Sequence, residues 1–289
     1  MPEPADHAPP QLSDTDVDLT KPNSARMYDW YLGGTSNWAV DRVFGERAVE
    51  TWPEVKACAR HNRDFLRRVV NAALDAGITQ FLDLGTGVPT VGNIHEVIAE
   101  SGELDRVDDA RVVYVDYEPV AAAHARQLLL DDDVAHWAAF VQADLRDPDA
   151  IWEHRETQRL DRSKPICVLM IAVLHFVGDG DLPHRILDTY RRRVAPGSWL
   201  AISHASNDAA PPEGAAQIAE VVASYQRTSN PMWLRDHAAV SSLLDAPGWD
   251  LLEPGVVHPP DWRPRLGVVL DAEQERARPF MWCGVAAKS

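Results

Sequence analysis

Three aspartates stand where short apolar runs end: Asp83, Asp116 and Asp144. Asp83 is followed by Gly85 and Gly87, whose missing side chains let a ligand approach the backbone closely. A helix that begins after such a turn offers free N–H groups to a polar ligand. The pattern is typical of the first strand and turn of a nucleotide-binding α/β unit. The alternative is an ordinary connection between a strand and a helix.

The second aspartate favours a nucleoside ligand. A carboxylate at the end of the second strand, at Asp116, can accept hydrogen bonds from both hydroxyls of a ribose. The gap from Gly85 to Asp116 is longer than the ~20 residues usual for this fingerprint, and the acidic segment 101–110 accounts for the extra length. Thr90 stands where a dinucleotide-binding turn has its third glycine, which argues against a dinucleotide. Alternatively, Asp116 is an acid favoured by the dipole of the following helix.

Asp144 lies in the segment that follows the third predicted strand. Its carboxylate can accept a hydrogen bond from the amino group of an adenine, and the backbone N–H of Leu145 can donate to a ring nitrogen. The other interpretation is a loop residue without a ligand. Asp147, just before Pro148, is better explained as a helix cap.

His175 follows the apolar run at 166–173, and sheets of this class bind ligands beyond the carboxyl ends of their strands. A neutral imidazole there can take a proton from a hydroxyl or an amine. It can equally be a structural histidine, and His204, after the fifth predicted strand, is a weaker candidate for the same role. The spacing of the histidines, thiols and carboxylates predicts no metal site.

Composition limits the possible partners. The 289 residues carry a net charge of −16, which argues against nucleic acid or an anionic membrane as a partner. No apolar run approaches the ~20 residues that span a bilayer, and the N-terminus lacks a signal peptide pattern. Three cysteines without paired spacing are typical of free thiols, so we expect a cytoplasmic protein.

Apolar periodicity predicts how these residues are positioned. Residues 1–20 read as a tail, and 24–76 as three helices, the first of them capped by Ser24. Strands and helices alternate afterwards, which indicates a parallel sheet with helices on both faces. The predicted strands are 81–84, 112–115, 137–141, 166–173, 199–203, 249–252 and 280–286. The predicted helices between and after them are 90–100, 119–130, one from Pro148, 182–194, 213–226 and 235–244.

Several segments in this order resemble an actinobacterial family of S-adenosylmethionine-dependent methyltransferases that was once catalogued as a domain of unknown function. They are residues 24–34 (SARMYDWYLGG), Asn37, 81–90 (FLDLGTGVPT), 93–96 (NIHE), 113–116 (VYVD), 142–147 (QADLRD) and 173–176 (VLHF). The resemblance extends from about residue 22 to the C-terminus. It implies an α/β, Rossmann-like class I methyltransferase fold, with a seven-stranded, mostly parallel sheet whose last strand is antiparallel.

The resemblance also implies S-adenosylmethionine as the cofactor and S-adenosylhomocysteine as the product. It divides the chain into a tail (1–21), a helical N-terminal cap (22–77) and a cofactor-binding domain (78–289). His175 is the candidate base. The cofactor-binding residues that it implies are Asp83, Gly85, Thr86, Gly87, Asp116, Tyr117, Asp144, Leu145 and Ala172, with Arg26, Tyr28, Gly34 and Asn37 covering the methionine end and Arg63 meeting the methionine carboxylate.

These observations predict a methyltransferase that acts on oxygen or nitrogen of a small molecule, because no basic patch suggests a polymer substrate. Two alternatives stay open: a non-catalytic module that binds S-adenosylmethionine, and an NAD-dependent oxidoreductase. The aromatic residues of the cap, among them Tyr28 and Tyr31, either face the ligand or pack in the core. The sequence does not indicate an oligomeric state.

Overall fold

The computed structural model describes residues 20–89, 92–101 and 109–289. Its sheet has seven strands in the order β3-β2-β1-β4-β5-β7-β6. All neighbours pair in parallel except β7, which is antiparallel to both β5 and β6, so the predicted class of sheet is confirmed. The strands are β1 (Gln80–Leu84), β2 (Arg111–Asp116), β3 (Ala138–Gln142), β4 (Cys167–Ile171), β5 (Trp199–Ala205), β6 (Trp249–Leu251) and β7 (Met281–Lys288).

Helices cover both faces of this sheet. They are α1 (Ser24–Tyr31), α2 (Ala39–Thr51), α3 (Val55–Asp75), α4 (Ile94–Glu100), α6 (Pro119–Asp131), α7 (Pro148–Glu153), α8 (Pro183–Arg192), α9 (Pro212–Tyr225), α10 (His237–Leu244) and α11 (Ala272–Ala277). Short 3₁₀ turns are η1 (Thr157–Arg159), η2 (Leu174–Phe176), η3 (Asp179–Asp181), η4 (Pro259–Asp261) and η5 (Arg278–Phe280). Among the described residues, no helix is both long and apolar enough to cross a membrane.

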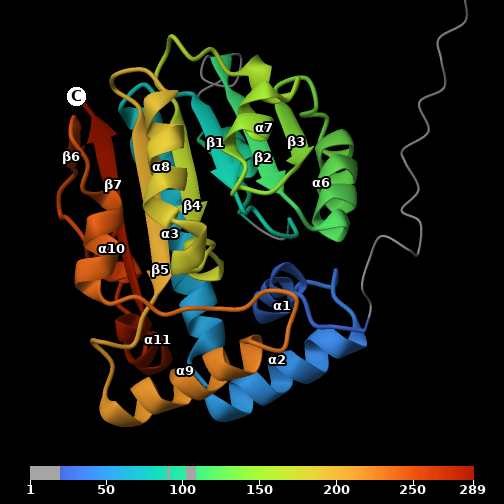
Figure 1. Cartoon of the computed structure of the whole chain (residues 1–289), viewed down its shortest axis with the longest axis vertical. Helices are drawn as coiled ribbons and strands as arrows, with labels where there is room; N and C mark the ends of the chain where they lie inside the picture. Colours follow the sequence, from blue (N-terminus) through green and yellow to red (C-terminus); the bar gives the residue numbers. More distant parts are fainter. Residues whose placement is uncertain (1–19, 90–91, 102–108) are drawn as a thin grey trace, which may run out of the picture.

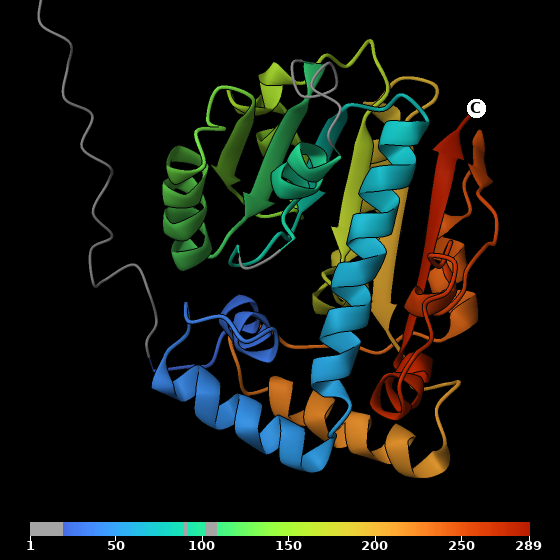
Figure 2. The same ribbon diagram turned by 180° about the vertical axis from the view of Figure 1, so that it is seen from behind.

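The core lies in two layers on either side of the sheet. One cluster joins α3, α4 and α6 to side chains such as Phe81 and Leu169, and the other joins α7, α8 and α10 to side chains such as Leu82 and Met170. The alternation follows from the two-residue period of a strand, which sends successive side chains to opposite faces. Figures 1 and 2 show the helices of these two layers from opposite sides of the sheet.

A third cluster lies beyond the carboxyl ends of the parallel strands. It is built from α1, α2, the start of α3 and α9, with buried side chains such as Met27, Tyr31 and Tyr225. Figure 2 shows these helices as a layer below the strand ends, with α3 passing from that layer up along the sheet. Because α3 belongs both to this layer and to the core of the sheet, it connects the two. The division at residue 77 stays a prediction.

Most elements lie where the sequence predicts them, and the differences have local causes. Asn23, not Ser24, caps α1, because its side chain accepts hydrogen bonds from the N–H groups of Ala25 and Arg26 at 2.8 and 3.4 Å. The helix expected at 90–100 begins only at Ile94. Gly92 has φ +73° and is not helical, while Thr90 lies outside the described residues.

Two further boundaries differ. β4 ends at Ile171, two residues early, because Ala172 adopts a φ of +55° and turns the chain into η2. The helix expected from residue 235 begins at His237, with the carboxylate of Asp236 capping it. The predicted tail, apart from residues 20 and 21, and most of the acidic segment 101–110 lie outside the described residues.

Candidate functional site

The turn after β1 brings a bare stretch of backbone to the carboxyl edge of the sheet. The N–H groups of Gly85 and Thr86 both donate to the carbonyl of Val115, at 2.8 and 3.1 Å. Gly85 and Gly87 have φ of +76° and +70°, a region that favours glycine. A Cβ on Gly85 would lie 2.2 Å from a methyl group of Val173. Both the positive φ and the lack of space therefore disfavour a side chain at this position.

Asp116 holds this turn in place. Its two carboxylate oxygens accept hydrogen bonds from the N–H groups of Gly87 and Glu118, at 2.8 and 2.9 Å. Burial raises the pKa of Asp116, although these backbone hydrogen bonds act in the opposite direction. Each oxygen of a carboxylate can accept a further hydrogen bond, so Asp116 can still bind two hydroxyls of a ligand.

The other two aspartates have different surroundings. Burial raises the pKa of Asp83 to about 6, against a hydrogen bond to Thr86 and the positive charge of Arg63. Asp144 is half-exposed. Burial opposes its ionisation, but hydrogen bonds from the side chain and backbone N–H of Arg146 outweigh burial and lower its pKa. At Asp83 the cost of burial thus outweighs the nearby charge of Arg63, whereas at Asp144 the hydrogen bonds from Arg146 outweigh burial.

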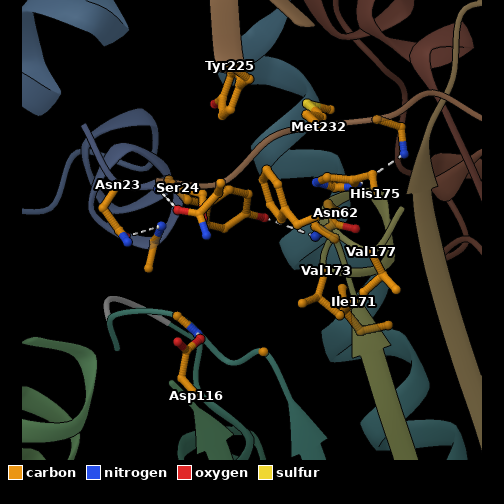
Figure 3. A pocket seen from close by; sticks show the side chains of 18 of the residues that line it. Asn23, Ser24, Asn62, Asp116, Ile171, Val173, His175, Val177, Tyr225 and Met232 are labelled. Carbon is orange, nitrogen blue, oxygen red and sulfur yellow. Dashed lines mark hydrogen bonds between the residues drawn. The ribbon is translucent and has the colours of Figure 1, made fainter. Parts of the chain in front are cut away.

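A cavity of about 300 Å³ is lined both by residues at this edge of the sheet and by residues of α1 and α9. Figure 3 shows Asp116 on one side of the cavity and Tyr225, on α9, on the opposite side. Twelve of the fifteen residues predicted for the site line the cavity: Tyr28, Arg63, Asp83, Gly85, Thr86, Gly87, Asp116, Tyr117, Asp144, Leu145, Ala172 and His175.

Arg63, on α3, brings a cation to the cavity. Its guanidinium carbon lies 5.9 Å from the centre of the Tyr28 ring. Its Nε is buried and has no hydrogen-bond partner among the described residues. A buried N–H without a partner costs free energy, so this atom is suited to an oxygen that a ligand supplies. Arginine is well shaped for a carboxylate.

Three predicted residues are not brought to the cavity wall. Arg26 is buried in the cap, where it forms ion pairs with Asp41 at 2.8 Å and with Glu118 at 2.9 Å. Gly34 lies against the carboxylate of Asp29, which a Cβ would meet at 2.0 Å. Asn37 donates to that carboxylate at 2.8 Å and to the Gly34 carbonyl at 2.9 Å. In this structure all three contact other residues of the cap or the end of β2, and their part in binding the cofactor stays a prediction.

The surroundings of His175 do not favour the predicted base. The N–H of Ala205 donates to its Nδ1 at 3.4 Å, and burial, with the nearby His204 and Arg235, lowers its pKa well below the usual value. A neutral ring that accepts at Nδ1 carries its proton on Nε2, and so acts as a hydrogen-bond donor there. The role of His175 as a base stays a prediction.

His204 is a structural histidine. It is fully buried, its Nδ1 is 2.8 Å from the Ala205 carbonyl, and its Nε2 is 2.8 Å from the guanidinium of Arg235. Burial lowers its pKa to about 4. It is not among the residues that line the cavity.

Sequence reasoning missed one wall of the cavity entirely. This wall comes from α9 and from the segment 226–236 that follows it, which includes Asn230 and Met232. Asn230 accepts from the N–H of Ser24 at 3.0 Å and donates to the hydroxyl of Tyr117, so it connects the cap to the end of β2. Apolar residues on a predicted helix do not reveal whether they face a core or a cavity.

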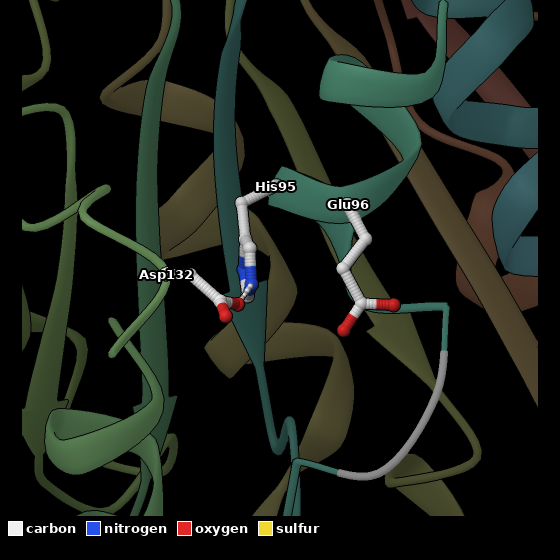
Figure 4. Close-up of side chains that lie close together, drawn as sticks. All are labelled: His95, Glu96 and Asp132. Atoms are coloured by element: carbon white, nitrogen blue, oxygen red, sulfur yellow. Dashed lines mark hydrogen bonds and ion pairs between the residues drawn. The ribbon is translucent and has the colours of Figure 1, made fainter. Parts of the chain in front are cut away.

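A second group of polar side chains lies at the start of α4. Figure 4 shows His95, Glu96 and Asp132, whose possible metal-ligating atoms lie within 4.8 Å of one another. Both nitrogens of His95 have partners: the hydroxyl of Tyr114 at 2.7 Å and Asp132 at 3.1 Å. Glu96 accepts from the N–H of Gly92 at 2.7 Å. This group fastens α4 to its neighbours.

Comparison with known proteins identifies a family and two similar solved structures. A model of a family described as S-adenosyl methyltransferase matches residues 10–289. A proposed methyltransferase from Thermobifida fusca YX is 35% identical, with a TM-score of 0.81 over 94% of this chain and 97% of that one. A DUF574 family protein from Streptomyces avermitilis MA-4680 is 34% identical, with a TM-score of 0.80 over 93% and 98%. A search of curated proteins finds no match.

The ion pairs of Arg26 give a first prediction. Replacing Arg26 by Met leaves Asp41 and Glu118 buried without their cation, so the free energy of unfolding should fall by about 3–5 kcal/mol. Urea denaturation measures this change. Arg60→Met is the matched control, because its ion pair with Glu273 is exposed and should be worth about 0–1 kcal/mol. Equal losses in both variants would contradict the structural role of Arg26.

The raised pKa of Asp83 gives a second prediction. The folded protein binds this proton more tightly than the unfolded chain does. Stability contributed by Asp83 should therefore fall as pH rises from about 4 to about 6. Relative to that of the Asp83→Asn variant, the free energy of unfolding of the wild type should fall by about 3 kcal/mol over that interval and should change no further above it. Denaturation at a series of pH values tests this, and parallel curves for the two proteins would rule it out.

Proposed function

The chain belongs to the S-adenosyl methyltransferase family, and from that premise we propose that its cavity binds the cofactor beside a small-molecule acceptor. The protein is an S-adenosylmethionine-dependent methyltransferase, and S-adenosylmethionine is its cofactor. Family membership also sets aside the NAD-dependent alternative. The residues that bind the cofactor, and the kind of acceptor, are the subject of the proposal.

One observation carries the proposed placement of the cofactor. Three carboxylates from successive strand ends, Asp83, Asp116 and Asp144, line the same cavity as the turn at 85–87. We assign Asp116 to the ribose hydroxyls, because its oxygens keep free acceptor positions. We assign Asp144 and the N–H of Leu145 to the adenine. The methionine end then lies toward Asp83 and the glycine turn.

The methionine carboxylate needs a cation, and Arg63 supplies one. Its buried Nε lacks a partner among the described residues, so an incoming carboxylate oxygen would complete its hydrogen bonds. The amino group of the methionine is cationic, and Asp83 would face it in its ionised form. Arg63 and Asp83 together thus match the two opposite charges of an amino acid.

When bound, S-adenosylmethionine supplies a methyl group that its positive sulfur already activates. The protein then has to hold an acceptor in line with that methyl group and keep water out. Buried side chains around the cavity and the cap formed by α1 perform that exclusion. His175, neutral and donating from Nε2, would orient an acceptor oxygen by a hydrogen bond.

The acceptor is proposed to be a small molecule. The net charge of −16 disfavours a nucleic acid, and the cavity, of about 300 Å³, is lined in part by α1 and by the segment 226–236. Cell extract, separated by dialysis into small and large components, tests this point with methyl-labelled cofactor. We expect label in the small components. Label only in the retained macromolecules, or in neither fraction, would refute it.

The role of Arg63 is tested by comparing two ligands. S-adenosylhomocysteine has the amino acid end, whereas 5′-methylthioadenosine lacks it. Arg63→Met should weaken binding of S-adenosylhomocysteine by about tenfold or more, the value of a hydrogen bond to a charged group. Binding of 5′-methylthioadenosine should not change. Calorimetric titration measures both affinities.

Arg67→Met is the matched control for that experiment. Arg67 lies one turn further along α3, does not line the cavity, and pairs with Glu100 in a partly exposed ion pair. Its replacement should leave both affinities as they are. Equal weakening of both ligands by Arg63→Met would show that Arg63 supports the cavity as a whole and does not bind the carboxylate.

A further inference from the structure

The side of the cavity opposite the three aspartates is built from uncharged, largely aromatic residues. We call it the apolar half. Its rings are Tyr28, Tyr31, Trp52, Phe176 and Tyr225, which come from α1, the end of α2, η2 and α9. These side chains belong to the third hydrophobic cluster or pack against it. Aromatic rings of this kind prefer offset or edge contacts with other rings.

The remaining walls of the apolar half are aliphatic or contain sulfur. Ile218 and Val221 come from α9, Cys58 from α3, and Met232 from the segment 226–236. Methionine side chains adapt to flat ligands and contact ring edges favourably. The side chains of this half therefore offer no formal charge. Arg63, near Tyr28, lies at its boundary with the half that contains the three aspartates, which we call the cofactor half.

The titratable groups here also stay neutral near pH 7. Burial raises the pKa of Tyr225 to about 12 and that of Tyr31 well above its usual value. Burial likewise raises the pKa of the Cys58 thiol, and the neighbouring Glu54 and Arg60 act on it in opposite directions. The imidazole of His175 is neutral for the reasons given above. A charged ligand group would lose its hydration here without gaining a counter-charge.

Two hydroxyls supply polarity within the apolar half. The oxygens of Tyr31 and Tyr225 lie 3.5 Å apart, which is long for a bond between hydroxyls. Each hydroxyl thus retains capacity to bond an oxygen of a ligand. Trp52, in the same wall, has a buried indole N–H without a partner among the described residues. The polarity available suits a neutral oxygen substituent.

From this arrangement we propose that the apolar half is the acceptor subsite, and that it takes an uncharged aromatic molecule with a second neutral oxygen at its far end. The proposal rests on the proposed function, since it assumes the cofactor in the half with the aspartates. On transfer, the acceptor oxygen bonds to the methyl carbon as the carbon–sulfur bond breaks. The sulfur keeps the bonding pair, and the acceptor's proton leaves to water.

Three naphthalene probes, which differ in the group at one end, test whether the apolar half prefers an uncharged ligand and whether it binds a second oxygen. They are 2,6-dihydroxynaphthalene, 2-naphthol without the second hydroxyl, and 6-hydroxy-2-naphthoate with a negative charge. Calorimetric titration into protein saturated with S-adenosylhomocysteine measures binding without relying on turnover. We expect 2,6-dihydroxynaphthalene to bind at least about tenfold more tightly than the naphthoate. Equal or tighter binding of the naphthoate would overturn the proposal.

Tyr225→Phe tests the far oxygen while keeping the ring. The variant should weaken 2,6-dihydroxynaphthalene about three- to tenfold, as expected for one neutral hydrogen bond. Affinity for 2-naphthol should stay the same. If the variant weakens both probes equally, or neither, the two hydroxyls do not bind the substituent, and that part of the proposal is wrong.

Val222→Lys tests the charge of the wall. Val222 is half-buried on α9 and lines the cavity, so a lysine there should raise the affinity for 6-hydroxy-2-naphthoate about tenfold. Val268→Lys is the matched control, because Val268 is exposed and does not line the cavity. Unchanged affinity in Val222→Lys would contradict a ligand site at this wall.

Binding of S-adenosylhomocysteine distinguishes a failure of the proposed function from a failure of the proposed acceptor subsite. Both lysine variants and Tyr225→Phe should bind it as the wild type does, which also shows that they fold. If the wild type fails to bind S-adenosylhomocysteine, the proposed function fails and this inference fails with it. If the wild type binds it but does not prefer the neutral probe, only the inference is overturned.

Discussion

A hydrogen bond from the Gly87 N–H to the carboxylate of Asp116 joins the turn after β1 to the end of β2, and the site depends on it. The turn can donate this bond because Gly85 and Gly87 adopt positive φ and carry no side chains. Parallel pairing of β1 with β2 and of β2 with β3 then places Asp83, Asp116 and Asp144 at one edge of the sheet. A cavity with acids on one side follows from strand register and a turn without side chains.

The two sides of that cavity differ in charge, and the difference has a physical cause. The half next to the strand ends is surrounded by backbone N–H groups, which can stabilise carboxylates such as Asp116 even when they are buried. Most of the opposite half comes from helices α1, α3 and α9, in which most backbone groups are bonded within the helix, with Trp52, Phe176 and Met232 added from beside them. Helices can build that wall only from side chains, and the side chains present are aromatic and aliphatic. A polar ligand end and an apolar ligand end therefore have separate places in one cavity.

The sequence predicted the sheet well because its signals are local. Apolar runs of four to eight residues and an acid before a glycine turn are properties of neighbouring residues, and the parallel arrangement follows from strand–helix alternation. The positions of Arg26, Gly34 and Asn37 were harder to predict, because each depends on contacts that the local sequence does not reveal. Arg26 meets Glu118, which is far along the chain, and Gly34 is constrained by Asp29. The wall from α9 carried no signal at all, since an apolar helix face looks the same over a core and over a cavity.

Glu118 connects the helical cap to the end of β2. Its backbone N–H donates to Asp116, while its carboxylate accepts from Arg26 at 2.9 Å and from Asn23 at 2.8 Å. Asn23 caps α1, so Glu118 links the position of that helix to the position of the Asp116 carboxylate. Asn230 makes a second connection, between the start of α1 and Tyr117. Because the charges of Arg26 and Glu118 are both buried, breaking their pair leaves a costly unpaired charge. The cap is thus joined to the end of β2, and a shift of α1 would disturb the bonds that position Asp116.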